Sequence, residues 1–298
     1  MTLPDEIRSA CARVAGEAQR VRIVAEAIDG YAETLPAEAP RPSEPVGATA
    51  EEQAAHILTL NAINFGSGWF PTLRKAPGAS GFRTVEAGVR AHAGWSAPAL
   101  ASISAAEIAQ ALGQDPGHEL MGLFATHLRE LGQRVEGEHG GSFLALARSG
   151  EGSAVRLAEG LAGWPTWQDV SRYGGRRVPF FKRAQIAAAD LALAGVAPAG
   201  DLERLTMFAD NLVPHVLRLN GILAFDAALV ERIERGELIE HGSAEEVEIR
   251  ACALHAVEVL VAAHGSTCAA AVDNALWLRG GEPRYKAVPR HRSRTTAY

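Results

Sequence analysis

Two aspartates stand among apolar neighbours and are the first candidates for chemistry. Asp273 lies one turn before Trp277 in an otherwise apolar segment. Facing inward, its carboxylate would be partly desolvated and suited to a reaction; facing outward, it would be an ordinary surface residue, which is the commoner case. Asp210 follows a predicted helix over 202–209 and would stand at its C-terminal end, where the helix dipole disfavours negative charge. That placement hints at function, although an exposed aspartate there costs only tenths of a kcal/mol.

A basic segment is a candidate site for a small anion. A proline opens a predicted helix, so the amides near Phe181 would lie at its positive end beside Lys182 and Arg183. Arg176 and Arg177 add positive charge just before it. The combination suits a phosphomonoester. A solvated basic helix start is the equally simple alternative.

A third segment joins small, polar and aromatic residues. Two glycines flank Ser67, so the backbone there can approach a ligand closely, and Phe65 and Trp69 on either side could wall a pocket. The alternative is a helix end and a turn, with the aromatic residues in the core. The basic end of the chain, 289–294, predicts either a solvated arm or, given the closing Tyr298, a tail folded back on the protein.

Familiar catalytic and metal motifs are missing from the sequence. His118-Glu119 begins like a zinc-protease helix, but Gly122 stands where the second ligand belongs. The ten histidines are scattered, and three cysteines without CxxC spacing indicate neither a disulfide framework nor a thiolate zinc site. We therefore expect no metal and no cofactor.

Composition narrows the class of protein. The 298 residues are 47% hydrophobic and 21% charged, which is typical of a globular chain. The net charge of −6 argues against an extended nucleic-acid surface, which needs many cations to neutralise phosphates. No signal peptide and no membrane-spanning run is visible, so a cytoplasmic, soluble protein is expected. The sequence carries no signal for an oligomeric state.

Helix signals dominate and strand patterns are rare. Capping boxes at Thr49–Glu52, Ser104–Glu107 and Ser243–Glu246 each predict a helix start, with ends near Gly66, Gly113 and Gly265. Further helices are predicted over 2–28, 118–132, 153–161, 180–195, 202–209 and 225–235, with a few short strands between 65 and 95. We predict one mainly α domain over 1–298, with or without two lobes. Residues 1–45 form its N-terminal helix and a proline-rich connection.

Several blocks together resemble the queuosine salvage family, the queuosine 5′-phosphate N-glycosylases/hydrolases. They are His56–Pro71, Phe181–Gln185, Leu205–Val216 and Glu246–Ala251, with Val272–Trp277 and His291–Tyr298 fitting the family's ending. The likeness runs from about residue 50 to the end. Asn211 and Trp69 stand where the family pattern has tyrosines, which concerns the pocket walls rather than the polar groups.

The resemblance implies an enzyme that hydrolyses queuosine 5′-monophosphate to queuine and ribose 5-phosphate. A helical architecture related to helix-hairpin-helix DNA glycosylases is also implied, with 217–229 as a candidate hairpin. Glycoside cleavage passes through an oxocarbenium-like sugar, and a 7-deaza base has no N7 to protonate. A carboxylate near C1′ is therefore expected to contribute strongly.

The resemblance, read with this chemistry, gives each candidate a role. Asp273 is the first choice at C1′, as nucleophile, stabiliser or base, and Asp210 the second; Asp210 otherwise binds the guanine-like edge. Lys182, with Arg183 less firmly, would hold the 5′-phosphate. The other substrate-binding candidates are His56, Asn64, Ser67, Trp69, Phe181, Phe208 and Trp277. Two alternatives stay open: a non-catalytic queuine- or nucleotide-binding protein, and a DNA or RNA base glycosylase, which the negative charge disfavours.

Overall fold

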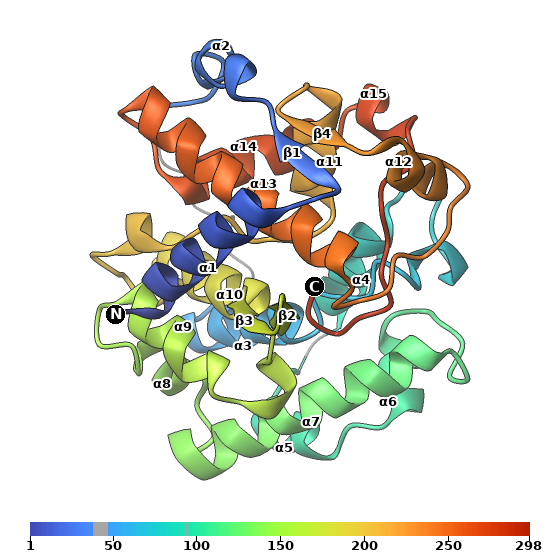
Figure 1. Ribbon diagram of the computed structural model, residues 1–298. Helices are drawn as coiled ribbons and strands as arrows, with labels where there is room; N and C mark the ends of the chain where they lie inside the picture. Colours follow the sequence, from blue (N-terminus) through green and yellow to red (C-terminus); the bar gives the residue numbers. More distant parts are fainter. Residues whose placement is uncertain (38–46, 93) are drawn as a thin grey trace.

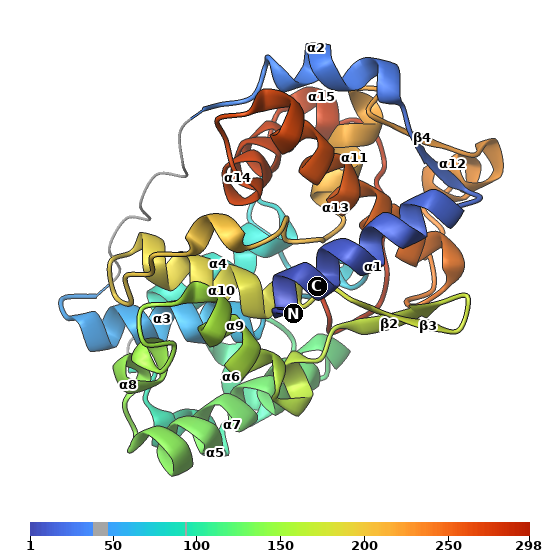
Figure 2. The same cartoon turned by 60° about the vertical axis from the view of Figure 1, so that its left-hand side comes forward.

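A computed structural model describes residues 1–37, 47–92 and 94–298. Most of the proline-rich connection predicted up to residue 45 lies outside these ranges. The described chain is mainly helical, with two hydrophobic cores in two halves that face each other (Figures 1 and 2). None of its helices is both long enough and apolar enough to cross a membrane.

The lower half of Figure 1 is built around the buried faces of two helices, α3 and α7. Helix α3 packs against α7, α8 and α10, and α7 packs against α5 and α6. The helices of this half are α3 (Ala50–Ala62), α4 (Gly81–Ala91), α5 (Ala97–Ser102), α6 (Ala105–Ala111), α7 (Glu119–His139), α8 (Phe143–Arg148), α9 (Ala154–Ala162) and α10 (Lys182–Leu193).

The other half surrounds α13 (Ala244–His264), which is buried along most of its length. Helix α13 contacts four helices of this half, which cover it on several sides. A helix that is apolar nearly all round belongs in such a position. The remaining helices of this half are α1 (Leu3–Glu17), α2 (Ile28–Ala32), α11 (Leu212–Leu219), α12 (Ala227–Glu234), α14 (Ala269–Arg279) and α15 (Pro283–Lys286). Short 3-10 turns are η1 (Ala25–Ala27), η2 (Phe70–Thr72), η3 (Pro165–Trp167) and η4 (Leu202–Arg204).

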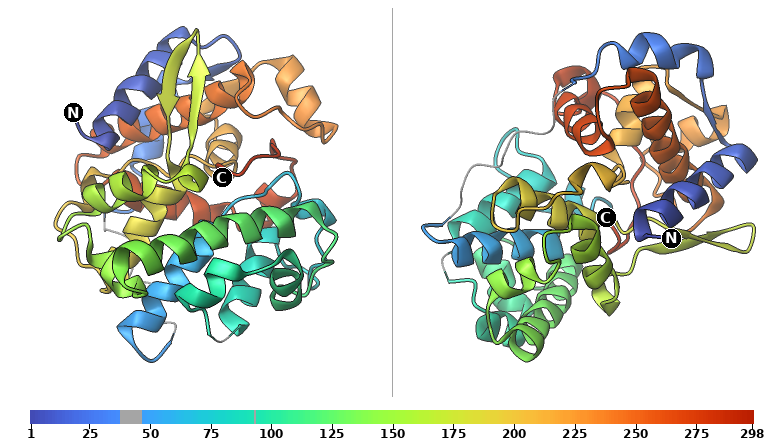
Figure 3. Two further views of the ribbon diagram at one scale, coloured as in Figure 1. Left: turned by 90° about the horizontal axis from the view of Figure 1, so that it is seen from below. Right: turned by 90° about the vertical axis from the view of Figure 1, so that its left-hand side faces the viewer.

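Four short strands form two antiparallel pairs. β1 (Val21–Ile23) pairs with β4 (Leu223–Phe225) and ties the N-terminal segment to the second half. β2 (Val170–Tyr173) and β3 (Arg176–Pro179) form a hairpin that projects from the molecule (Figure 3). Its turn is Gly174-Gly175, and both glycines have positive φ, as a tight two-residue hairpin requires.

Most of the predicted helices are confirmed. The three capping boxes start α3, α6 and α13, and the threonine or serine of each accepts a hydrogen bond from the backbone three residues on. Helices α7, α9, α10 and α12 correspond to the helices predicted over 118–132, 153–161, 180–195 and 225–235.

Three local predictions were wrong. The helix over 2–28 ends at Glu17, because the amides of Arg20 and Val21 donate to the Glu248 carboxylate and the chain then pairs with β4. In the described part of 65–95 there is no strand; that part holds η2 and α4, whose start is capped by Ser80. The third is the helix over 202–209, of which only the 3-10 turn η4 is present.

The segment 217–229 holds the end of α11, strand β4 and the start of α12. Its correspondence to a glycosylase hairpin is not confirmed and stays a prediction. The basic tail folds back between the two halves, where the C mark stands in Figure 1, and the Gly66 amide donates to the carbonyl of Tyr298 at 3.1 Å.

Candidate active site

A cavity of about 810 Å³ is lined by elements of both halves. Helices α3, α10 and α14 each present one face to it, with lining residues spaced three or four apart. From α3 these are Gln53, His56, Ile57, Leu60 and Asn61, with Asn64 just beyond its end; from α14 they are Ala270, Asp273, Asn274, Trp277 and Leu278. Helix α4, the segment 208–212 and the C-terminal part of the chain also line the cavity.

Asp273 faces inward, which settles the choice left open by its sequence. It is 6% exposed, and its Oδ1 accepts a hydrogen bond from the Phe208 amide at 3.0 Å. Burial raises the pKa of Asp273 well above its ordinary value, and the nearby negative charge of Asp210 raises it further. The Phe208 amide and the Lys182 ammonium oppose this shift. Asp273 is therefore a desolvated carboxylate that shares a cavity with a second one.

The prediction that Asp210 stands at the C-terminal end of a helix over 202–209 was wrong. Only η4 is helical there, and Asp210 instead precedes α11, where its Oδ1 accepts from the amides of Leu212 at 2.8 Å and Val213 at 3.2 Å. A carboxylate at a helix N-terminus is stabilised by the helix dipole. The helix dipole therefore stabilises the Asp210 carboxylate, whereas the sequence predicted a position where the dipole disfavours it.

Side chains hold the segment 205–209 in an extended form. The Thr206 amide and hydroxyl bond to the Gln185 side chain, the Phe208 amide to Asp273, and the Ala209 carbonyl to Arg250. Because these partners satisfy the backbone and hydroxyl groups, the segment needs no helical hydrogen bonds. It presents Phe208 and Asp210 to the cavity.

Lys182 begins α10 and is the buried cation of the cavity wall. Its Nζ donates to the Asn64 carbonyl at 3.0 Å, and its amide donates to Asp169 at 3.0 Å. Burial lowers the pKa of Lys182 to about 8, against the opposing effect of Asp210 and Asp273. Phe181, the residue before it, has φ of 49°, a strained value for a non-glycine residue that turns the chain from β3 into α10.

The other predicted cations do not join Lys182. Arg183 points away from the cavity, donates to the carbonyls of Ala62 and Thr166, and lies over the rings of Phe65 and Trp167. Arg176 and Arg177 lie on the exposed hairpin and pair with Glu17 and Glu6. The expected basic cluster is therefore split, and Lys182 alone of its members lines the cavity.

The structure brings most of the predicted binding residues together. Ser67 Oγ is buried and has no hydrogen-bond partner among the described residues. Trp277 packs edge-on against Phe82 and under the Arg83 guanidinium. Trp69 and Phe181 are buried in the core of the lower half and do not line the cavity. The predicted residues that do line it are His56, Asn64, Ser67, Lys182, Phe208, Asp210, Asp273 and Trp277.

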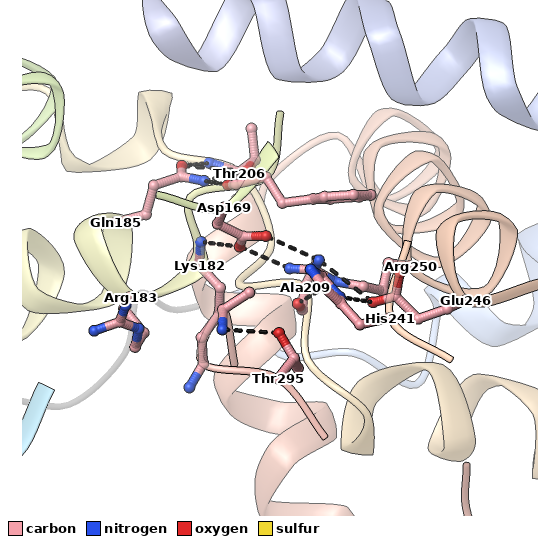
Figure 4. Close-up of polar contacts among 12 residues, drawn as sticks. Asp169, Lys182, Arg183, Gln185, Thr206, Ala209, His241, Glu246, Arg250 and Thr295 are labelled. Carbon is pink, nitrogen blue, oxygen red and sulfur yellow. Dashed lines mark hydrogen bonds and ion pairs between the residues drawn. The ribbon is translucent and has the colours of Figure 1, made fainter. Parts of the chain in front are cut away.

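A fully buried ion-pair network fixes the segments that carry these groups (Figure 4). Arg250 of α13 binds Asp169 through two nitrogens at 2.9 and 2.7 Å and lies 3.5 Å from Glu246. Its guanidinium lies between the rings of Phe180 and Tyr298. Asp169 also accepts a hydrogen bond from the Lys182 amide, and Arg250 donates to the carbonyl of Ala209, the residue before Asp210. The network therefore positions both Lys182 and Asp210.

The tail is held by a close backbone approach. A Cβ atom at Gly68 would lie 2.5 Å from the carbonyl oxygen of Ser293 and 2.8 Å from the Arg294 amide nitrogen. Glycine is therefore required there for the tail to pass. The tail contributes Arg290, Arg292 and Tyr298 to the cavity wall, in agreement with the folded-back alternative.

The sequence matches the family model described as queuosine salvage protein over residues 44–298. The chain belongs to this family. It is 37% identical over 269 residues to the queuosine 5′-phosphate N-glycosylase/hydrolase of Sphaerobacter thermophilus, covering 83% of this chain and 82% of the relative. Proteins of the same name from Bos taurus and Mus musculus are 36% and 31% identical, over 45% and 57% of this chain and 40% and 56% of their own lengths.

Sequence reasoning missed two acidic residues of this cavity, Glu86 on α4 and Asp190 on α10. Asp190 lies on the cavity face of α10, eight residues after Lys182, and accepts from Asn61 Nδ2 at 2.9 Å. The signal was present, because Asp190 is the lone acid in an apolar helix, as Asp273 is. Applying the same criterion to 182–193 would have found it.

Proposed function

We propose that this chain hydrolyses the N-glycosidic bond of queuosine 5′-phosphate, releasing queuine and ribose 5-phosphate. The observation that carries the proposal is the meeting of Asp273, Asp210 and Lys182 at one cavity. The relative that matches over most of both lengths is named for this activity. In the reaction the bond from C1′ to the base breaks, and water supplies the new oxygen on C1′.

We place Asp273 beside C1′, as nucleophile, stabiliser of the oxocarbenium-like sugar, or base for water. Its burial supports this role, because a charge in a water-poor site acts on a developing cation with little screening. Asp210 would bind the N–H donors of the guanine-like edge, and Phe208, next to it on the same segment, would pack on the base. His56, Asn64 and Ser67 would meet the hydroxyl groups.

Product analysis tests the reaction itself. Incubation with queuosine 5′-monophosphate is expected to give queuine and ribose 5-phosphate in equal amounts on chromatography. Binding of the nucleotide without release of queuine would instead show a non-catalytic binding protein.

We also propose a cytoplasmic location and a small-molecule substrate in place of extended nucleic acid. The three free cysteines support the location, and the net charge of −6 supports the substrate class.

Removal of the lysine should cost phosphate recognition selectively. We expect Lys182→Met to lower kcat/KM for the 5′-monophosphate by roughly 10- to 150-fold, because a hydrogen bond to a charged group contributes about 1.5–3 kcal/mol. The nucleoside queuosine, which has no phosphate, should lose little. Steady-state kinetics on both substrates make the comparison. An equal loss on both would remove Lys182 from the phosphate site.

The pH profile should show the two charged groups. With pKa of about 8, Lys182 loses its charge as pH rises through that value, so kcat/KM for the monophosphate should fall on the alkaline side. Because the pKa of Asp273 is raised, its active carboxylate form should be lost at a higher pH than that of an ordinary aspartate as the solution is acidified. In Lys182→Met the alkaline fall should disappear and the acidic one remain; an unchanged alkaline fall would contradict the assignment.

A further inference from the structure

Asp190 is a carboxylate that the proposed mechanism does not use. It lines the cavity on the same face of α10 as Lys182, Ile186 and Ala189. Eight residues of helix separate it from Lys182, which is about 12 Å along the axis. Burial raises the pKa of Asp190 to about 6, while Asn61 and Lys182 lower it. Asp190 thus lies in the same cavity as the charged cluster but away from its end of the helix.

The hydrogen bonds around Asp190 hold one of its oxygens and leave the other available. Asn61 Nδ2 donates to Asp190 Oδ2 at 2.9 Å and to the Ile57 carbonyl at 3.1 Å. Asn61 Oδ1 accepts from Asn64, which fixes the amide with its nitrogen toward Asp190. Among the described residues nothing donates to Asp190 Oδ1, and no Lys or Arg lies within ion-pair distance of the carboxylate.

The other cavity carboxylates have partners. Glu86 binds Arg83 at 2.6 Å, and Asp210 accepts two amides of α11. Asp273, like Asp190, accepts one neutral donor, the Phe208 amide, but the proposed mechanism already uses it. Asp190 is half-buried, and a half-buried carboxylate with a single neutral donor is still partly desolvated, a cost that a cationic ligand lowers. Asp190 therefore favours a ligand that brings a positive charge and an N–H donor.

Queuine contains such a group. Its arm is joined to the 7-deazaguanine ring through a secondary alkylamine, which is protonated at neutral pH. Resting on the proposed function, we propose that Asp190 binds the secondary ammonium of the queuine arm and selects substrates that carry it. With the phosphate at Lys182, a nucleotide extended along α10 would direct its arm toward Asp190.

Binding of three free bases to wild type and Asp190→Asn tests this inference. The bases are queuine, 7-aminomethyl-7-deazaguanine, which keeps the ammonium without the ring diol, and 7-deazaguanine, which has neither. Calorimetry should show a loss of about 10- to 100-fold for the two cationic bases, as expected for a charge-assisted hydrogen bond, and a change within about twofold for 7-deazaguanine. Unchanged binding of that neutral base also shows that the variant is folded.

Glu86→Gln is the matched control, because it removes a cavity carboxylate that already has an arginine partner. It should leave the preference for cationic bases unchanged. Weaker binding of queuine alone would indicate contact with the diol and would overturn the inference. The inference would also be overturned if all three bases lost affinity equally, or if none lost affinity. Hydrolysis is measured separately: a wild type that binds cationic bases selectively but releases no queuine would overturn the proposed function and leave this inference standing.

Discussion

Asp273→Asn should lower kcat on queuosine 5′-monophosphate by about a thousandfold or more, the scale seen when a preorganised electrostatic group is removed. Asparagine has nearly the same shape and its Oδ1 can still accept from the Phe208 amide, so the local structure should persist. What disappears is the negative charge beside the sugar. With a base that has no N7 to protonate, little else in the cavity can replace its effect.

Binding separates this effect from damage to the site. The dissociation constant of queuine should change by only a few-fold in Asp273→Asn, since the base is assigned to Asp210 and Phe208. Asp210→Asn is the matched variant, and it should raise KM and weaken queuine binding. If Asp210→Asn abolishes turnover and Asp273→Asn mainly raises KM, the two roles are reversed. Retained turnover in Asp273→Asn would refute its catalytic role.

Arg250→Met should lower the free energy of unfolding by about 3–5 kcal/mol, because it leaves Asp169 and Glu246 as buried charges without their cation. Methionine retains much of the volume between Phe180 and Tyr298, so packing loss contributes less. Urea denaturation measures the change. Activity should fall as well, because the network holds the segments before Asp210 and Lys182.

Two controls sharpen that result. Arg235→Met removes an exposed arginine with surface ion pairs and should cost at most about 1 kcal/mol. The double variant Arg250→Met with Asp169→Asn should be less destabilised than the sum of the two single variants, because removing both partners leaves fewer unpaired charges. A loss below about 1 kcal/mol in Arg250→Met would show that the network does not stabilise the fold.

Local sequence signals predicted what depends on local structure. Ser243 caps the start of α13 as predicted, although the Glu246 carboxylate accepts from the Gly242 amide and not from Ser243, and Gly265 ends the helix with positive φ. The segment after Leu202 was different, because its hydrogen-bond partners Gln185, Asp273 and Arg250 are far away in the sequence. The helical pattern therefore put Asp210 after a helix, whereas it lies before one. The prediction nevertheless picked out Asp210, which lines the cavity.

The sequence also did not show in which direction each side chain points. Lys182 and Arg183 are adjacent, yet α10 turns one toward the cavity and the other toward the carbonyls of Ala62 and Thr166. Successive residues of a helix point about 100° apart, so adjacent side chains can face different surroundings. Spacings of three, four and eight would have grouped Lys182 with Asp190 instead of Arg183.

A crystal structure of Asp273→Asn with queuosine 5′-monophosphate tests the central claim most directly. The slowed variant should hold the intact nucleotide with C1′ beside residue 273, the base edge on Asp210 and the phosphate at Lys182. Density for the nucleotide outside this cavity, or with C1′ remote from both aspartates, would contradict the account.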